Sequence, residues 1–208
     1  RASGAVRGGR QGGGEAGGGG GGGGLAGHPK ALGPGADDRA GFAVGVVEKS
    51  RAIDGRRIAA GDVLLGLASS GPHSNGFSLI RSIIERSQAD LGQKIAGVTG
   101  ARTLGETLLE PTRIYVKPVR SLMGACDIKA MAHITGGGLS ENTHRMFPEQ
   151  LAAHGDSRGW PRPPIFDWRQ QQGGGDAAEM HRVFNCGIGF VLVVAPDTAA
   201  AAIARLSE

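Results

Sequence analysis

The stretch Val63–Arg81 (VLLGLASSGPHSNGFSLIR) joins an apolar run, a loop of small polar residues and a second apolar pattern in direct succession. Val63–Leu67 is short and apolar, as in a β-strand of a protein core. Phe77, Ile80 and Ile84 recur at the spacing of an amphipathic helix. The stretch therefore predicts a strand–loop–helix unit, with a histidine, an asparagine and two glycines where the helix begins.

A second unit of the same kind follows later in the chain. Ile128–Ile134 is expected to be a strand, Thr135–Gly138 a glycine loop and Leu139–Phe147 a helix. A helix N-terminus leaves backbone N–H groups unpaired and carries a partial positive charge, and glycine in front of it lets a ligand approach the backbone. If the two units lie on neighbouring strands, we expect them to suit a phosphorylated or doubly anionic ligand.

Structural roles are the alternative for both loops. Ser74 and Asn75 are good N-cap residues, and Gly136–Gly138 could form only a tight turn. Neither loop matches a P-loop or a complete GxGxxG motif. His73 and His133 differ from the other histidines, because each lies at the loop end of a predicted strand, where α/β folds bind ligands. A structural role is the alternative for each of them.

Other reactive residue types carry little functional signal. Cys126 and Cys186 stand alone, which is typical of a reducing cytosol, and Cys186 is expected to pack in the core rather than act as a nucleophile. Asp54 and Asp62 are interpreted as turn residues. His, Cys, Asp and Glu show no metal-ligand spacing in the sequence.

The predicted elements alternate between strands and helices, which indicates an α/β fold: an α+β mixed sheet with flanking helices. Residues 88–105 are expected to be a loose connection and residues 148–175 a Pro/Gly-rich excursion. The further strands are predicted at Phe42–Glu48 and Gly187–Ala195, and the further helices at Thr107–Glu110, at Arg113–Met123 around Pro118, at Ile165–Gln172 and at Thr198–Leu206.

Residues 1–40 differ in composition from the rest of the 208-residue chain. They hold 17 of its 39 glycines, so we expect a disordered arm. The net charge of +4 suits anionic small molecules as well as nucleic acid. No apolar run approaches the roughly 20 residues that span a bilayer, and no hydrophobic region of a secretory signal is present. Because the sequence does not begin with Met, we expect a fragment.

Longer motifs extend over roughly residues 40–206 in a fixed order. They are AGFAVGVVEKS, IDG, GDVLLGLASSGPHSNGFSLIR, LLEPTRIYVKPV, MAHITGGGLSEN, PPIFDW and EMHRVFNCGIGFVLVV. In sequence, order and spacing they resemble the family of phosphoribosylformylglycinamidine cyclo-ligase, also called aminoimidazole ribonucleotide synthetase. Their length makes this resemblance more specific than any single loop.

The resemblance implies a reaction of purine biosynthesis. The family uses ATP and Mg²⁺ to activate the formyl (amide) oxygen of formylglycinamidine ribonucleotide as a phosphate intermediate. A nitrogen then displaces phosphate and closes the imidazole ring. The resemblance also implies a cytoplasmic homodimer whose subunits have two α/β domains with the active site between them. We expect no membrane association and no nucleic-acid partner.

The resemblance also assigns site residues. His73 matches the histidine implicated in the family's active site, and we expect it to donate a hydrogen bond to developing charge or to position the amide. The residues expected to bind substrate are Ser74, Asn75, Gly76, His133, Thr135, Gly136, Gly137 and Gly138.

In the family's frame the chain has three parts. Residues 1–40 are the arm, residues 41–60 the last strand of the family's N-terminal domain with a linker, and residues 61–208 a C-terminal cyclo-ligase domain truncated at its end. The family's ATP loop, of the form DGVGTK, has no counterpart, so we expect the main ATP and Mg²⁺ ligands to be absent from this chain. Thr143-His144 stands where the family commonly has Ile-Pro.

Three alternative functions remain open. Selenophosphate synthetase, thiamine-monophosphate kinase and a hydrogenase maturation protein share the two-domain plan, but the LLEPTRIYVKPV and NCGIG segments argue against them. Arg7-Gly8-Gly9-Arg10 resembles an RNA-binding RGG element, in an arm with few basic residues and no aromatic one. The third alternative is a non-catalytic fragment that binds phosphate ligands.

Overall fold

The structure is a computed structural model that describes residues 44–207. The chain divides into two units, Arg1–Ala52 and Ile53–Glu208. In the described part of the first unit, residues 44–48 have no regular structure and Lys49–Arg51 forms a short 3-10 helix, η1. The predicted glycine-rich arm and the RGG-like element lie outside the described residues.

The strand predicted at Phe42–Glu48 is not formed over residues 44–48, so this prediction is wrong for the part that can be examined. Val44 and Val46 are 98% and 100% exposed. A strand requires a partner for its backbone N–H and C=O groups, and no other segment of residues 44–207 pairs with this one. β-branched residues favour strands, but this preference alone does not form a strand where no partner segment pairs with it.

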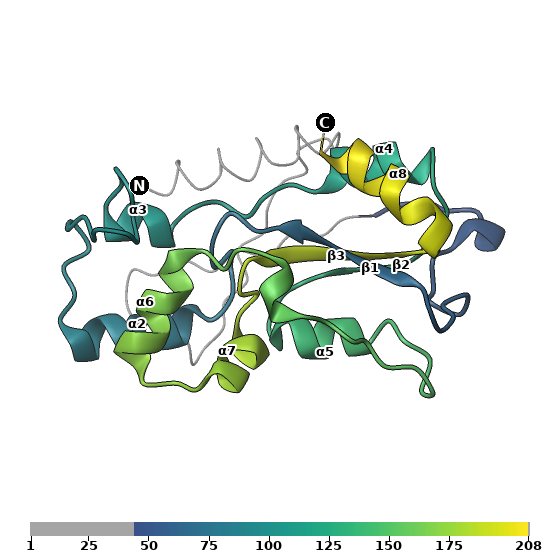
Figure 1. Ribbon diagram of the computed structural model, residues 1–208. Helices are drawn as coiled ribbons and strands as arrows, with labels where there is room; N and C mark the ends of the chain where they lie inside the picture. Colours follow the sequence, from purple (N-terminus) through teal and green to yellow (C-terminus); the bar gives the residue numbers. More distant parts are fainter. Residues whose placement is uncertain (1–43, 208) are drawn as a thin grey trace. The chain divides into compact units, whose positions relative to one another are not determined.

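The second unit is built around a three-stranded sheet (Figure 1). Its strands are β1 (Val63–Ala68), β2 (Ile128–His133) and β3 (Ile188–Val194), in the order β1-β3-β2 and with both pairs antiparallel. All three strands were predicted. The central strand β3 is the most apolar and is buried at nearly every position. The mixed α/β fold with flanking helices is therefore confirmed, with a small antiparallel sheet.

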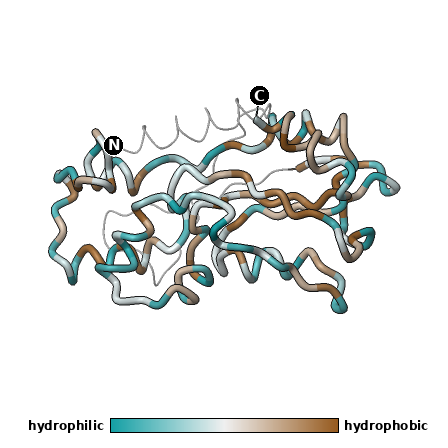
Figure 2. Tube along the Cα trace, in the orientation of Figure 1, coloured by the Kyte–Doolittle hydropathy of each residue, from teal (hydrophilic) through white to brown (hydrophobic). Residues whose placement is uncertain are grey.

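Helices cover both faces of this sheet. Figure 1 shows α4 (Val116–Met123) and α8 (Pro196–Leu206) on one face and α5 (Gly138–His144) on the other. Leu192 of β3 packs with α4 and α8, whereas Val191 packs toward α5. Figure 2 shows the resulting band of hydrophobic residues along the strands. Each such buried side chain stabilises the fold by about 1.5–3 kcal/mol.

A second core lies at one end of the sheet, on the left in Figure 1. It is formed by α2 (Phe77–Ser87), α3 (Leu104–Leu108), α6 (Pro164–Gly173) and α7 (Ala177–Val183). The apolar stripe of α2 predicted this burial correctly. The buried members of this core are Ile80, Ile83, Leu104, Leu108, Ile165, Phe166, Trp168, Met180, Phe184 and Cys186.

Two helices of this core depart from the sequence prediction. Helix α3 was expected at Thr107–Glu110 but begins after Thr103, whose side chain forms a capping box with Glu106. For helix α7 the sequence placed only His181 on a helix surface and gave no bounds. Helix α7 begins after Asp176, whose Oδ1 accepts a hydrogen bond from the N–H of Glu179 at 2.7 Å. Both helix starts depend on local capping, which the pattern of apolar residues does not reveal.

The sheet order also corrects one expectation about the two strand–loop–helix units. Strands β1 and β2 are not neighbours, because β3 lies between them. Both are antiparallel to β3, so they run in the same direction and end at the same edge of the sheet. The two predicted loops therefore still meet at one place.

Candidate functional site

The two loops that follow β1 and β2 converge beside the start of β3. The rings of His73 and His133 lie 6.2 Å apart between centroids. A Cβ placed on Gly136 would lie 3.9 Å from the side-chain oxygen of Asn75. The residues chosen from sequence on the two units are thus brought together, although they are 60 residues apart in the chain.

His73 is held tightly within the first loop. It is only 2% exposed and its backbone has a left-handed φ of 56°. Its Nε2 accepts hydrogen bonds from the N–H groups of Ser70, at 3.1 Å, and of Arg113, at 3.5 Å. This pattern assigns the proton of the neutral ring to Nδ1.

The environment keeps His73 uncharged. Burial, with smaller contributions from His133 and Arg113, lowers the pKa of His73 to about 4. The Nδ1 atom is buried and has no hydrogen-bond partner among residues 44–207. A buried donor without a partner costs about 1–3 kcal/mol, so Nδ1–H is the one polar group of this ring that an additional acceptor would satisfy.

Aromatic side chains surround the two histidines. The Tyr115 ring lies 6.1 Å from both His73 and His133, and the Phe190 ring lies 5.3 Å from Tyr115. The Tyr115 hydroxyl donates to the carbonyl of Ala68 at 2.8 Å, and burial raises its pKa to about 12. His133 is exposed at the rim, where partial desolvation lowers its pKa. Sequence reasoning did not identify Tyr115, although it lies within the LLEPTRIYVKPV motif.

Each of the two loops is hydrogen-bonded to the side chain of a buried asparagine. Asn142 of α5 donates from Nδ2 to the carbonyls of Thr135, Gly136 and Gly138 at 3.3, 3.1 and 2.8 Å. Its Oδ1 accepts the hydroxyl of Thr135 at 3.2 Å, so this hydroxyl is already engaged. The signal in the sequence was a polar residue on the inward side of a helix.

Asn185 does the same for the first loop. Its Nδ2 donates to the carbonyl of Gly71 at 2.9 Å. Its Oδ1 accepts from the Ser69 hydroxyl at 3.0 Å and from the N–H of Gly187 at 2.9 Å. Satisfied buried networks of this kind rigidify a structure. The backbone of both loops is therefore set before any ligand arrives.

The capping alternative for Ser74 and Asn75 is wrong. The N-cap of α2 is Gly76, with a left-handed φ of 72°, and no side chain within residues 44–207 caps it. The Ser74 hydroxyl instead hydrogen-bonds with the Thr112 hydroxyl at 3.2 Å. The N-cap of α5 is likewise a glycine, Gly137, with φ 94° and no side-chain cap from the described chain. The start of α2 thus presents backbone N–H groups without a competing side chain, whereas at the start of α5 the Glu141 carboxylate lies close to Gly137.

The glycines of the second loop differ in what the fold requires of them. Gly137 and Gly138 have left-handed φ values of 94° and 61°, and a Cβ on Gly138 would overlap the carbonyl of His181. These two glycines are explained by structure alone. Gly136 has neither feature, and its nearest neighbour would be Asn75 at 3.9 Å. Gly136 is therefore the glycine of this loop that the fold does not explain.

Two other expectations were tested. Cys186 is buried, and burial raises its pKa to about 11, so the prediction of a packing role is confirmed. Asp54 accepts from the N–H of Arg56 at 3.1 Å, as expected of a turn residue. Asp62 does more than form a turn, because its carboxylate pairs with Lys129 at 2.6 Å and is 5% exposed.

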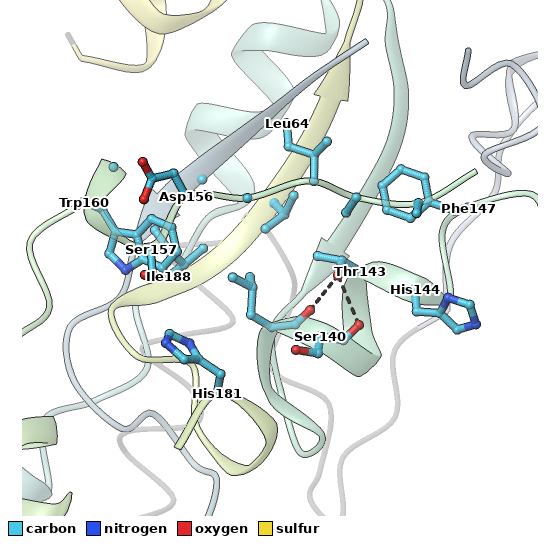
Figure 3. Close-up of a pocket in the computed structure, with 17 residues that line it drawn as sticks. Leu64, Ser140, Thr143, His144, Phe147, Asp156, Ser157, Trp160, His181 and Ile188 are labelled. Carbon is cyan, nitrogen blue, oxygen red and sulfur yellow. Dashed lines mark hydrogen bonds between the residues drawn. The ribbon is translucent and has the colours of Figure 1, made fainter. Parts of the chain in front are cut away.

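A cavity larger than those beside the two histidines lies elsewhere. It has a volume of about 790 Å³ and lies on the α5 face of the sheet, between Leu64, Trp160 and His181 (Figure 3). Its described lining includes none of the predicted site residues. Smaller hollows border the site itself, one of about 390 Å³ beside His73 and one of about 380 Å³ beside His133.

Among residues 44–207, no three His, Cys, Asp or Glu side chains lie close enough together to hold a metal ion. In the same range, no helix is long and apolar enough to cross a membrane.

Comparison with known protein families identifies the family of this chain. The family model described as "AIR synthase related protein, C-terminal domain" matches residues 59–208. The chain belongs to this family. The match includes both loops and the three strands, so the site lies wholly within the family's C-terminal domain.

Several curated relatives are named "Phosphoribosylformylglycinamidine cyclo-ligase". The protein from Burkholderia vietnamiensis is 59% identical over 173 residues, which are 83% of this chain and 48% of the relative. Those from Paraburkholderia xenovorans and Paraburkholderia phymatum are 60% and 54% identical, over 83% and 99% of this chain and 48% and 57% of the relatives. The chain thus spans about half the length of the curated relatives it matches.

A solved structure also matches at a low score. It is that of E. coli HypE, a hydrogenase maturation protein, with a TM-score of 0.39 and 16% identity over 73% of this chain and 40% of that chain. A likeness at this level carries no argument about fold or function.

Proposed function

We propose that this chain forms the substrate-holding part of a phosphoribosylformylglycinamidine cyclo-ligase, a ligase of purine biosynthesis. The reaction would be the ATP-dependent ring closure of formylglycinamidine ribonucleotide to aminoimidazole ribonucleotide. The names of the relatives and the family match support this assignment. The observation that carries it is the meeting of the His73 loop and the Gly136 loop at one edge of the sheet.

The proposed role of His73 is to donate a hydrogen bond from Nδ1 to the formyl (amide) oxygen of the substrate. A ring with a pKa of about 4 is neutral at pH 7, and its Nε2 is occupied by two backbone donors. It is therefore suited to polarising an oxygen rather than to carrying a proton between groups. His73 would be the catalytic residue of this chain.

The proposed contact for the phosphate of the ribonucleotide is the start of α2. Ser74, Asn75 and Gly76 lead into this 11-residue helix, whose first N–H groups are not capped by a side chain from the described chain. From the other loop we propose His133 and the backbone of Gly136, Gly137 and Gly138. Because the Thr135 hydroxyl is bonded to Asn142, Thr135 would contribute through its main chain.

ATP and Mg²⁺ remain part of the proposal for the whole protein only. The roles proposed for residues 44–207 are confined to holding and polarising the ribonucleotide. A homodimer and a cytoplasmic location belong to the same proposal.

Titration of the full chain with formylglycinamidine ribonucleotide tests the proposal. His73→Asn keeps an N–H near the position of Nδ1, whereas His73→Gln keeps a polar group only near Nε2. We expect Asn to retain most of the affinity and Gln to lose about tenfold or more, as when a hydrogen bond worth about 1.4 kcal/mol is removed.

Thermal melts of both variants serve as the control, because Asn also tolerates the left-handed backbone of residue 73 better than Gln does. Affinities are compared only under conditions in which both variants are folded. Equal affinity of both variants and the parent chain would contradict the role of His73. Absence of any binding to the parent chain would contradict the proposed function, and equal affinity for inorganic phosphate would favour a generic phosphate-binding fragment.

A further inference from the structure

Gly189 occupies a β-bulge of the central strand, directly beside His73. Along β1, Leu67 pairs with Phe190 and Ala68 with Ile188, so the register passes over Gly189. Toward β2, the carbonyl of Gly189 accepts the N–H of Ile134 at 2.9 Å. Bulges next to functional sites serve to re-aim neighbouring groups.

The absence of a side chain at Gly189 is required by space and not by backbone conformation. Gly189 is not among the described glycines with a positive φ. A Cβ at this position would lie 2.5 Å from His73 Cε1 and closer still to the Tyr115 hydroxyl. Two side chains from other parts of the chain thus occupy the volume that any larger residue would need.

We propose that Gly189 and Tyr115 are positioning residues that hold the His73 imidazole in the orientation that presents Nδ1–H to the substrate. The proposal rests on the function proposed above and deepens it. The backbone N–H groups of Ser70 and Arg113 hydrogen-bond to Nε2 and so fix that side of the ring. The Cε1 atom packs against the backbone of Gly189. The centroid of the Tyr115 ring lies 6.1 Å from that of the His73 ring. The Tyr115 hydroxyl donates a hydrogen bond to the carbonyl of Ala68 at the bulge.

The pKa of His73 depends on the position of its imidazole ring. The groups that face it are His133 of β2, Arg113 and Tyr115 of the segment before α4, and Ser70 of its own loop. Burial is the largest cause of the low pKa of His73, followed by the charges of His133 and Arg113. A ring displaced toward solvent would regain a pKa near the ordinary 6.5.

The first test needs no ligand. Nitrogen-15 chemical shifts of His73 are followed against pH in the full chain and in Gly189→Ala. In the parent chain we expect the Nδ1–H tautomer and no protonation above pH 5, and in Gly189→Ala a pKa raised toward 6 with loss of the single tautomer. Gly66→Ala is the matched control, because its Cβ would lie 2.9 Å from the Ile188 side chain and would not contact His73. An unchanged His73 pKa in folded Gly189→Ala overturns the proposal.

The second test uses formylglycinamidine ribonucleotide and a double-mutant cycle. We expect Gly189→Ala to weaken binding about tenfold in the parent chain but to have no further effect in His73→Ala, because the two residues act through one contact. Additive losses would mean that Gly189 acts independently of His73. If the parent chain binds no ribonucleotide, the proposed function fails while the pH titration still decides the role of Gly189.

Gly189→Ala could fail to fold, because it places a methyl group against two rings. Tyr115→Leu then takes its place, since it removes the aromatic ring beside His73 without adding atoms. We expect the His73 pKa to rise in this variant, because the ring loses a buried neighbour. A folded Tyr115→Leu chain with His73 still neutral at pH 5 and in a single tautomer would overturn the positioning role of Tyr115.

Discussion

Replacing Arg169 with methionine is expected to stabilise the folded chain. Arg169 of α6 is 1% exposed, and none of its three guanidinium nitrogens has a hydrogen-bond partner among residues 44–207. Its guanidinium instead lies 3.4 Å from the centre of the Phe184 ring and 5.4 Å from that of Phe166. Methionine would keep the unbranched shape and the contacts with both rings while removing the charge.

The magnitude follows from the two opposing contributions. Burial lowers the pKa of Arg169 from 12.5 to about 9, which corresponds to roughly 5 kcal/mol of lost stabilisation of the cation. Because arginine keeps its proton in proteins, this loss lowers stability directly. Stacking of the guanidinium on the aromatic rings stabilises the folded chain by about 2 kcal/mol. The net gain from Arg169→Met is therefore about 2–3 kcal/mol, or roughly 5–10 °C in Tm for a chain of this size.

Urea unfolding and thermal melts at pH 7 measure this effect. Arg158→Met is the matched control, because the Arg158 side chain is 86% exposed and its replacement is expected to change stability by less than about 0.5 kcal/mol. A loss of stability in Arg169→Met would refute the reasoning. It would mean that the buried guanidinium is compensated by a group such as a bound anion or water.

Two further changes test the site and the sheet. Gly138→Ala should destabilise the chain by about 2 kcal/mol or more, because it combines a left-handed φ of 61° with overlap on the His181 carbonyl, whereas Gly136→Ala should cost less than about 1 kcal/mol and weaken ribonucleotide binding; equal losses in urea unfolding would contradict this. Burial favours the neutral form of Asp62, but hydrogen bonds from Lys129 and Ala59 hold its pKa below the ordinary value. Stability from Asp62 is therefore complete above the ordinary carboxyl pKa and is lost as pH falls through the lower folded value. Between pH 7 and pH 3 the parent chain should lose more stability than Asp62→Asn, and parallel pH profiles would show that the pair contributes nothing.

Much of the fold could be predicted because local pattern and burial agree. The β3 strand lies in the longest run of apolar and β-branched residues, and it is the strand buried on both faces. The apolar stripe of α2 faces the core as its spacing predicts. Loops rich in glycine and polar residues fall at the ends of β1 and β2, because such residues neither pack nor pair well in a strand.

The remaining features depend on contacts that no local pattern contains. The place of β3 between β1 and β2 is set by long-range pairing, and residues 44–48 lack such a partner within the described chain. Arg169 would be assigned to the surface by its charge, yet two aromatic rings cover it. Gly189 is one glycine among many in the sequence, and only the approach of His73 and Tyr115 shows why it has no side chain.

The most direct test of the central claim is an amide and side-chain NMR titration of the full chain with formylglycinamidine ribonucleotide. We predict shifts at Gly76, Gly136 and the Nδ1–H of His73, while Trp160 and His181 at the separate 790 Å³ cavity stay unchanged. Shifts confined to that cavity, or none at millimolar ligand, would contradict a substrate site formed by the two loops.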